Sequence, residues 1–220
     1  METVQNPGRN TRIEWLVLAA TLTFASHAVT DNLFLFSWTR VPSLLREMGM
    51  ENFWYLLSLL FGLALALSAP RRSGLRIGDV RPHLRGVLVA CGIPVILAAI
   101  IYPLLPVRPF SGAAAGLWLI SPPAQDLLFI GYLYGRLEPL YPHFVSPRIP
   151  MRRALVITAL FFSAWHLPNF STIPSGFVVF QISYTFAIFI VAGLSRQWTG
   201  SMLYFTLSHM GINFIAWWVK

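Results

Sequence analysis

Residues 121–135, SPPAQDLLFIGYLYG, place a carboxylate in an otherwise apolar region of the chain. Gln125 and Asp126 lie in this segment, with apolar sequence on both sides for most of a membrane thickness. An ionisable group at such a depth is costly, so its presence indicates a functional site. Two histidines in later apolar stretches, His166 and His209, are the predicted partners of the carboxylate.

Composition assigns the whole chain to the membrane class. The chain has 220 residues, of which 56% are hydrophobic and 11% are charged, and its mean hydropathy is +0.63. A soluble domain carries about 25% charged residues. At about 20 apolar residues per span, this length predicts one all-α membrane domain of about seven transmembrane helices.

The apolar stretches locate the predicted spans. They cover approximately residues 15–38, 53–68, 86–105, 112–135, 154–167, 177–194 and 201–218. Pro122 and Pro123 break the fourth stretch. Ser121 is a suitable N-cap with Pro122 at the first helical position, so a new helix is predicted to begin there, below the membrane surface. Gly131 and Gly135 follow at a spacing that lets another helix approach closely. The fifth span is short, about 20 Å as a helix, and places His166 at its end.

The net charge of +8 is distributed as in a membrane protein, with the basic residues in short loops. Twelve of the 16 basic residues lie on the predicted side of the N-terminus, and Arg196 is counted among these loop residues. This asymmetry predicts a multi-pass protein of the cell (inner) membrane with a cytoplasmic N-terminus. The bilayer is therefore the expected environment, and nucleic acid is not expected as a partner.

Two further motifs add polar groups to Asp126. Phe162-xxx-His166 and His209-xxx-Asn213 each place two side chains one helical turn apart. One carboxylate, two imidazoles and one amide can activate a water molecule. The carboxylate then acts as general base, one histidine orients the water, and the other histidine and the amide stabilise the oxyanion. Alternatively, Asp126, His166 and His209 ligate a zinc ion that generates the hydroxide, so zinc and no cofactor both stay open.

In order and placement, the three motifs resemble those of the CPBP intramembrane proteases. This group contains the type II CAAX prenyl endopeptidases and the bacterial abortive-infection and bacteriocin-immunity proteins. The family pattern is Glu-Glu-xxx-Arg, then Phe-xxx-His, then His-xxx-Asn, and the last two are intact here. The resemblance covers about residues 86–218. It divides the chain into residues 1–85, with two spans and a basic loop, and a protease-like core at residues 86–220.

The first motif departs from the family pattern. The Phe129-Ile130-Gly131 triplet fixes the register, because the family typically has Phe-Arg-Gly there. Gln125 then occupies the position of the first glutamate, Asp126 that of the second, and Ile130 that of the arginine. Two carboxylates and one arginine carry the same formal charge as one aspartate alone. We therefore expect Asp126 to act as the base and Gln125 to orient the water or the scissile carbonyl.

The resemblance implies an intramembrane endopeptidase that hydrolyses a peptide bond in a membrane-anchored or lipidated protein or peptide. A catalytically silent relative that binds a membrane partner is the alternative, and the changes at Gln125 and Ile130 favour it. A small transporter is disfavoured because inverted repeats are absent. His27 and Asp31 lie one turn apart in the first span and match no family motif; a local hydrogen bond between them is expected.

Overall fold

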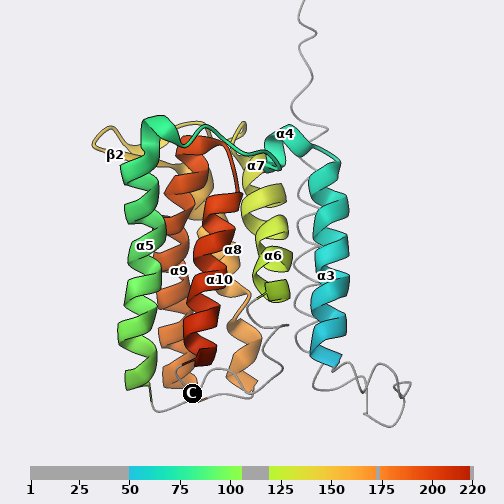
Figure 1. Ribbon diagram of the computed structural model, residues 1–220, viewed down its shortest axis with the longest axis vertical. Helices are drawn as coiled ribbons and strands as arrows, with labels where there is room; N and C mark the ends of the chain where they lie inside the picture. Colours follow the sequence, from blue (N-terminus) through green and yellow to red (C-terminus); the bar gives the residue numbers. More distant parts are fainter. Residues whose placement is uncertain (1–49, 106–118, 172–173, 219–220) are drawn as a thin grey trace, which may run out of the picture.

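The computed structural model describes residues 50–105, 119–171 and 174–218 (Figure 1). The predicted first span, with His27 and Asp31, lies outside these residues. The helices and strands are α3 (Met50–Leu67), α4 (Pro70–Ser73), η2 (Arg81–His83), α5 (Leu84–Ile101), η3 (Tyr102–Leu104), α6 (Ser121–Asp126), the π-helical η5 (Leu127–Leu133), α7 (Tyr134–Leu137), β1 (Phe144–Ser146), β2 (Ile149–Arg152), α8 (Arg153–Ala164), η6 (Leu167–Ser171), α9 (Ser175–Thr199) and α10 (Leu203–Trp218).

The described helices lie side by side with their axes roughly parallel in space (Figure 1). α10 packs against α5, α9 and α6, α8 packs against α9, and α3 packs against α6 and η5. Large apolar side chains of η5, α8, α9 and α10 form the main buried core, among them Phe129, Ile130, Phe162, Phe189 and Phe205. The predicted all-α architecture is correct for most of the described chain.

Two described segments are long and apolar enough to cross a membrane, Arg81–Leu104 and Ser175–Thr199. Only 22% and 28% of the residues in their apolar windows are buried. The core helix of a soluble protein would be mostly buried, so these surfaces suit contact with lipid. The count of seven spans stays a prediction.

A small antiparallel sheet lies in the stretch before α8 that was predicted as a basic loop. Phe144 pairs with Arg152 and Ser146 pairs with Ile149, on either side of a turn at Pro147. Aromatic and β-branched residues flank that turn, which is the usual composition of a short hairpin. The hairpin lies at the same end of the molecule as α4 and α7 (Figure 1).

The new helix predicted at Ser121 is present, but the predicted cap is wrong. Ile120 occupies the cap position with helical backbone angles, φ −101° and ψ −45°, and no side chain caps α6. Residues 119–120 already form a π-helical turn. Ser121 therefore lacks the non-helical backbone that an N-cap requires. Its hydroxyl instead accepts a hydrogen bond from Gln125 Nε2 at 3.1 Å.

Arg196 is not a loop residue as predicted, because α9 continues to Thr199. Its side chain is 3% exposed, and Nη2 donates to the carbonyl oxygen of Arg72 at 2.5 Å. The guanidinium also lies 5.5 Å from the centre of the Tyr134 ring. The last carbonyls of a helix carry partial negative charge, so the C-terminal end of α4 compensates this buried cation. Gly74 follows α4 with φ +72°, and a Cβ there would lie 2.6 Å from the guanidinium.

The close approach predicted for Gly131 and Gly135 occurs, and its partner is the short helix α4. A Cβ on Gly135 would come within 3.0 Å of the Arg72 carbonyl oxygen, which belongs to the backbone. A Cβ on Gly131 would lie 3.5 Å from the Ser73 carbonyl oxygen and 3.2 Å from the Met202 sulfur. These glycines therefore let the η5–α7 segment pack directly against α4.

We expect Gly135→Ala to lower the free energy of unfolding by about 1–3 kcal/mol, because backbone atoms leave no room for the methyl group. Gly92→Ala is the matched control, since no neighbouring segment of the described chain lies within 4 Å of a Cβ at that position in α5. Thermal unfolding of the purified proteins in detergent measures both. Equal melting temperatures for the two variants would contradict the packing described for Gly135.

Candidate functional site

The site is centred on a contact between α6 and α10. Asp126, the last residue of α6, is fully buried, and its Oδ1 lies 2.8 Å from Nδ1 of His209. An ionised carboxylate can only accept a hydrogen bond, so Nδ1–H of His209 donates to it. This tautomer leaves Nε2 of the imidazole free to accept a proton. The structure thus brings together the carboxylate and one of its predicted partners.

A π-helical segment, η5, begins directly after Asp126. Such segments are rare and are frequently found at functional sites. All seven residues of η5 are buried, so the wider turn is held by packing on every side. Ile130, at the position of the family arginine, is 0% exposed and belongs to the apolar core. At this position of the first motif, the structure therefore has a buried apolar side chain in place of a charged one.

Phe162 of α8 joins the two histidines. Its ring centre lies 5.8 Å from that of His166 and 5.6 Å from that of His209, with interplanar angles of 74° and 84°. These edge-to-face contacts are typical of stable aromatic pairs. Phe129 packs against Phe162 in the same manner, with ring centres 5.3 Å apart. The aromatic cluster therefore fixes two imidazoles that come from different parts of the chain.

Two buried polar atoms near this cluster have no hydrogen-bond partner among the described residues. They are Oδ2 of Asp126 and Nδ1 of His166. Buried polar atoms in proteins are almost always paired, either with protein or with ordered water. These two atoms are consequently the expected contacts of a bound water molecule or of a substrate.

The two amides of the predicted set differ in their surroundings. Asn213 is buried on α10, one turn beyond His209. Gln125 is half-buried, and its amide nitrogen donates to Ser121 on the same helix. That contact directs the Gln125 amide nitrogen towards the start of α6. A catalytic role for either amide stays a prediction.

The described residues do not fit a zinc site. Among them, no group of three or more histidine, cysteine, aspartate or glutamate side chains is arranged to hold a metal ion. A catalytic zinc ion in proteins usually has three protein ligands. We therefore derive no step through a metal from Asp126, His166 and His209.

Sequence reasoning missed two parts of this site. Phe129 served only to fix the register of the first motif, whereas its ring packs against both Phe162 and Trp165. The π-helical turn was not predicted at all. The available signal for the aromatic contacts was the phenylalanine in each of the first two motifs, Phe129 and Phe162.

The family comparison covers the part of the chain that contains this site. Residues 107–215 match a family model described as Rce1-like, type II CAAX prenyl endopeptidase Rce1-like. This region of the chain belongs to the Rce1-like family. A search of curated proteins gave no match, and a search of solved structures gave none either.

Membership of the Rce1-like family confirms the predicted relationship to the CPBP intramembrane proteases. The matched region contains Asp126, His166 and His209. It begins at residue 107, so α3 and α5 lie outside it, although the resemblance was predicted from residue 86 onward. The family is membrane-embedded, in agreement with the two apolar helices that are long enough to cross a bilayer.

Proposed function

We propose that this chain is an intramembrane endopeptidase that uses Asp126 and His209 to activate a water molecule. Its substrate is a membrane-anchored or lipidated protein or peptide. The observation that carries the proposal is the 2.8 Å contact between His209 Nδ1 and a fully buried carboxylate. The carboxylate's second oxygen is buried and has no partner among the described residues. Membership of a protease family supports the same reading.

The two carboxylate oxygens have different tasks in this mechanism. Oδ1 is held by the imidazole N–H of His209, which fixes the orientation of the carboxylate. Oδ2 accepts a proton from the water as its oxygen attacks the carbonyl carbon of the peptide bond. When the carbon–nitrogen bond breaks, Asp126 returns this proton to the leaving amine. The protein thus ends the cycle in the protonation state in which it began.

The developing oxyanion needs hydrogen-bond donors that are already in position. His166 has a buried Nδ1 without a partner among the described side chains, and the aromatic cluster holds its ring. We assign His166 and Asn213 to this role. Gln125 orients the water or the scissile carbonyl, as its position in the first motif suggests.

The depth of the site indicates where the scissile bond lies. All ten arginines of the described residues belong to loops and helix ends at the end of the molecule that carries α4, α7 and β2 (Figure 1). Along the helix axis, Asp126 is about 8 Å from Ser121, at the opposite end, and about 16 Å from Leu137, at the arginine-rich end. By the positive-inside rule the arginine-rich end faces the cytoplasm. Because the hydrocarbon core is about 30 Å thick, the proposed cleavage therefore occurs near the middle of the cell membrane, with the N-terminus cytoplasmic.

A catalytically silent member of the family is the second candidate. Two observations support it: Ile130 is a buried apolar side chain, and Gln125 is an amide that donates to Ser121. Residues 125 and 130 both correspond to charged residues in the family pattern. Such a protein would use the same polar site to bind a membrane partner. It would keep the Asp126–His209 contact without turnover.

Peptide cleavage by purified protein in lipid bilayers tests the enzyme proposal. We expect His166→Ala to lower the cleavage rate of lipidated fluorogenic peptides by about 10²–10³-fold, as for loss of a donor to the oxyanion. We expect His209→Ala, which removes the partner that orients the Asp126 carboxylate, to lower it by about 10²–10⁴-fold, as for impaired acid–base catalysis. His143→Ala is the control, because His143 lies exposed in a loop. Cleavage is expected to persist with a chelator. Equal rates in wild type and both site variants would contradict the proposed roles.

A further inference from the structure

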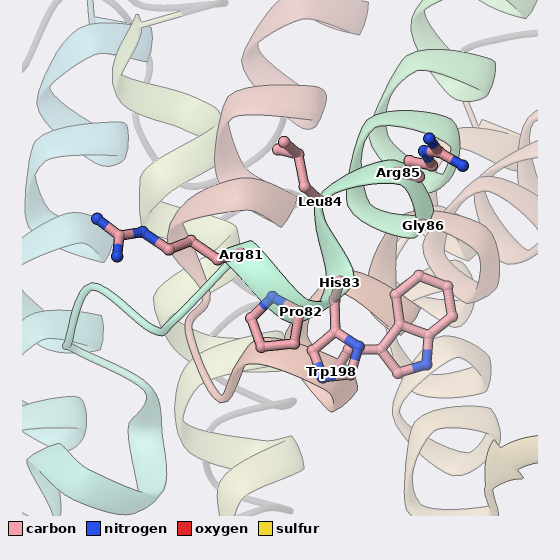
Figure 2. Close-up of a pocket in the computed structure, with 7 residues that line it drawn as sticks. All are labelled: Arg81, Pro82, His83, Leu84, Arg85, Gly86 and Trp198. Carbon is pink, nitrogen blue, oxygen red and sulfur yellow. The ribbon is translucent and has the colours of Figure 1, made fainter.

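A second polar site lies at the arginine-rich end of the molecule, away from Asp126. It is a pocket of about 490 Å³ between the start of α5 and the end of α9. Residues 81–86 and Trp198 line it (Figure 2). Neither the proposed peptidase mechanism nor the matched family motifs use these residues. Their chemistry therefore requires a separate explanation.

The lining combines positive charge with an aromatic wall. Arg81 and Arg85 are exposed, and their side chains extend to opposite sides of the His83–Trp198 pair (Figure 2). The rings of this pair are stacked, with centres 6.4 Å apart and an interplanar angle of 24°. The nearby carboxylate of Asp79 accepts a hydrogen bond from the Arg81 backbone N–H, the first of η2, at 3.0 Å. The lining stays net positive and suits an anionic group.

The surface next to the pocket is apolar. Beyond Arg85 along the helix, α5 exposes large aliphatic side chains over most of its length, including Leu88, Ile93, Ile96 and Ile100. Tryptophan is enriched at the membrane–water interface, so Trp198 is suited to lie at the level of the lipid headgroups. Its ring packs against Gly86, where an added Cβ would lie 2.9 Å from the indole. A ligand with an anionic head and long acyl chains matches both surfaces, whereas a free anion matches only the first.

We propose that this pocket binds the headgroup of an anionic phospholipid, with its acyl chains lying along the exposed face of α5. Basic pockets at the cytoplasmic ends of membrane helices commonly bind such headgroups. Arg81 and Arg85 attract the anionic headgroup from opposite sides of the pocket, and the indole of Trp198 packs against the glycerol backbone. This proposal does not depend on peptidase activity.

Native mass spectrometry of the purified full-length chain in detergent tests the proposal. The probes are phosphatidylglycerol and phosphatidylcholine with identical acyl chains. We expect wild type to retain phosphatidylglycerol in preference. Arg81→Gln/Arg85→Gln is expected to bind it about 30-fold more weakly, the effect of two arginines near anionic lipid. Arg148→Gln/Arg153→Gln removes the same charge from exposed positions outside the pocket and is expected to bind like wild type.

Two further measurements keep the test decisive. Trp198→Ala keeps every charge and removes the aromatic wall, so we expect weaker phosphatidylglycerol binding in this variant as well. Inorganic phosphate is expected not to displace the lipid, because it has no acyl chains. Equal lipid binding by wild type and both pocket variants, or an equal loss in the pocket and control charge variants, would overturn the proposal. Displacement by inorganic phosphate would also overturn it, in favour of a soluble anion.

Discussion

Asp126→Asn is expected to lower kcat/KM for peptide cleavage by about 10²–10⁴-fold, because the amide cannot accept the proton of the attacking water. Asparagine has nearly the same shape, and its side-chain oxygen can still accept the hydrogen bond from His209 Nδ1 that Oδ1 accepts in the wild type. The substitution therefore removes the base with little change in packing. Steady-state cleavage of a genuine substrate in lipid bilayers measures the effect.

Glu138→Gln is the matched control for this substitution. It removes a carboxylate at the arginine-rich end, where Glu138 pairs with Arg152. We expect the control to cleave at the wild-type rate, since Glu138 lies outside the proposed site. Undiminished cleavage by Asp126→Asn would remove the assignment of Asp126 as the base.

His209→Ala is expected to lower the free energy of unfolding by about 3–5 kcal/mol, as is typical when a buried charge loses its partner. The reason is that Asp126 is fully buried and loses its hydrogen-bond partner. Denaturation of the purified variant in micelles at neutral pH measures this loss. His143→Ala, at an exposed loop position, is expected to change stability by less than about 0.5 kcal/mol.

The double variant Asp126→Asn/His209→Ala separates electrostatics from packing. An asparagine is less costly to bury without a partner than a carboxylate is. The two substitutions should therefore be less destabilising together than the sum of their separate effects, by about 0.5–3 kcal/mol. Strict additivity would mean that the 2.8 Å contact contributes no coupling energy.

The helices and the composition of the site could be predicted from the sequence because both depend on local pattern. Long apolar stretches specify α3, α5, α9 and α10 within a few residues. Polar residues are rare in such stretches, so Asp126 and His209 were recognisable as partners before any contact was known. The motif spacing then predicted that His166 and Asn213 would lie near them, and the structure shows His166 and His209 in contact with the same Phe162 ring.

The predictions from sequence were wrong where contacts between distant segments determine burial or the position of a helix end. Arg196 is buried because the end of α4 offers a backbone carbonyl 124 residues earlier in the chain, which no local pattern reveals. Ser121 fails to cap α6 because the π-helical turn before it already has helical geometry. Helix ends depend on such tertiary contacts more than on propensity.

The proposed mechanism requires Asp126 to catalyse peptide hydrolysis in a membrane-associated substrate. Mass-spectrometric mapping of protein termini in membranes from cells that carry wild type or Asp126→Asn tests this requirement, since it needs no prior choice of substrate. We predict a set of new termini in membrane-anchored or lipidated proteins that is present with wild type and absent with the variant. Identical termini in both membranes, with both proteins present at equal levels, would contradict the account and favour the silent binding protein.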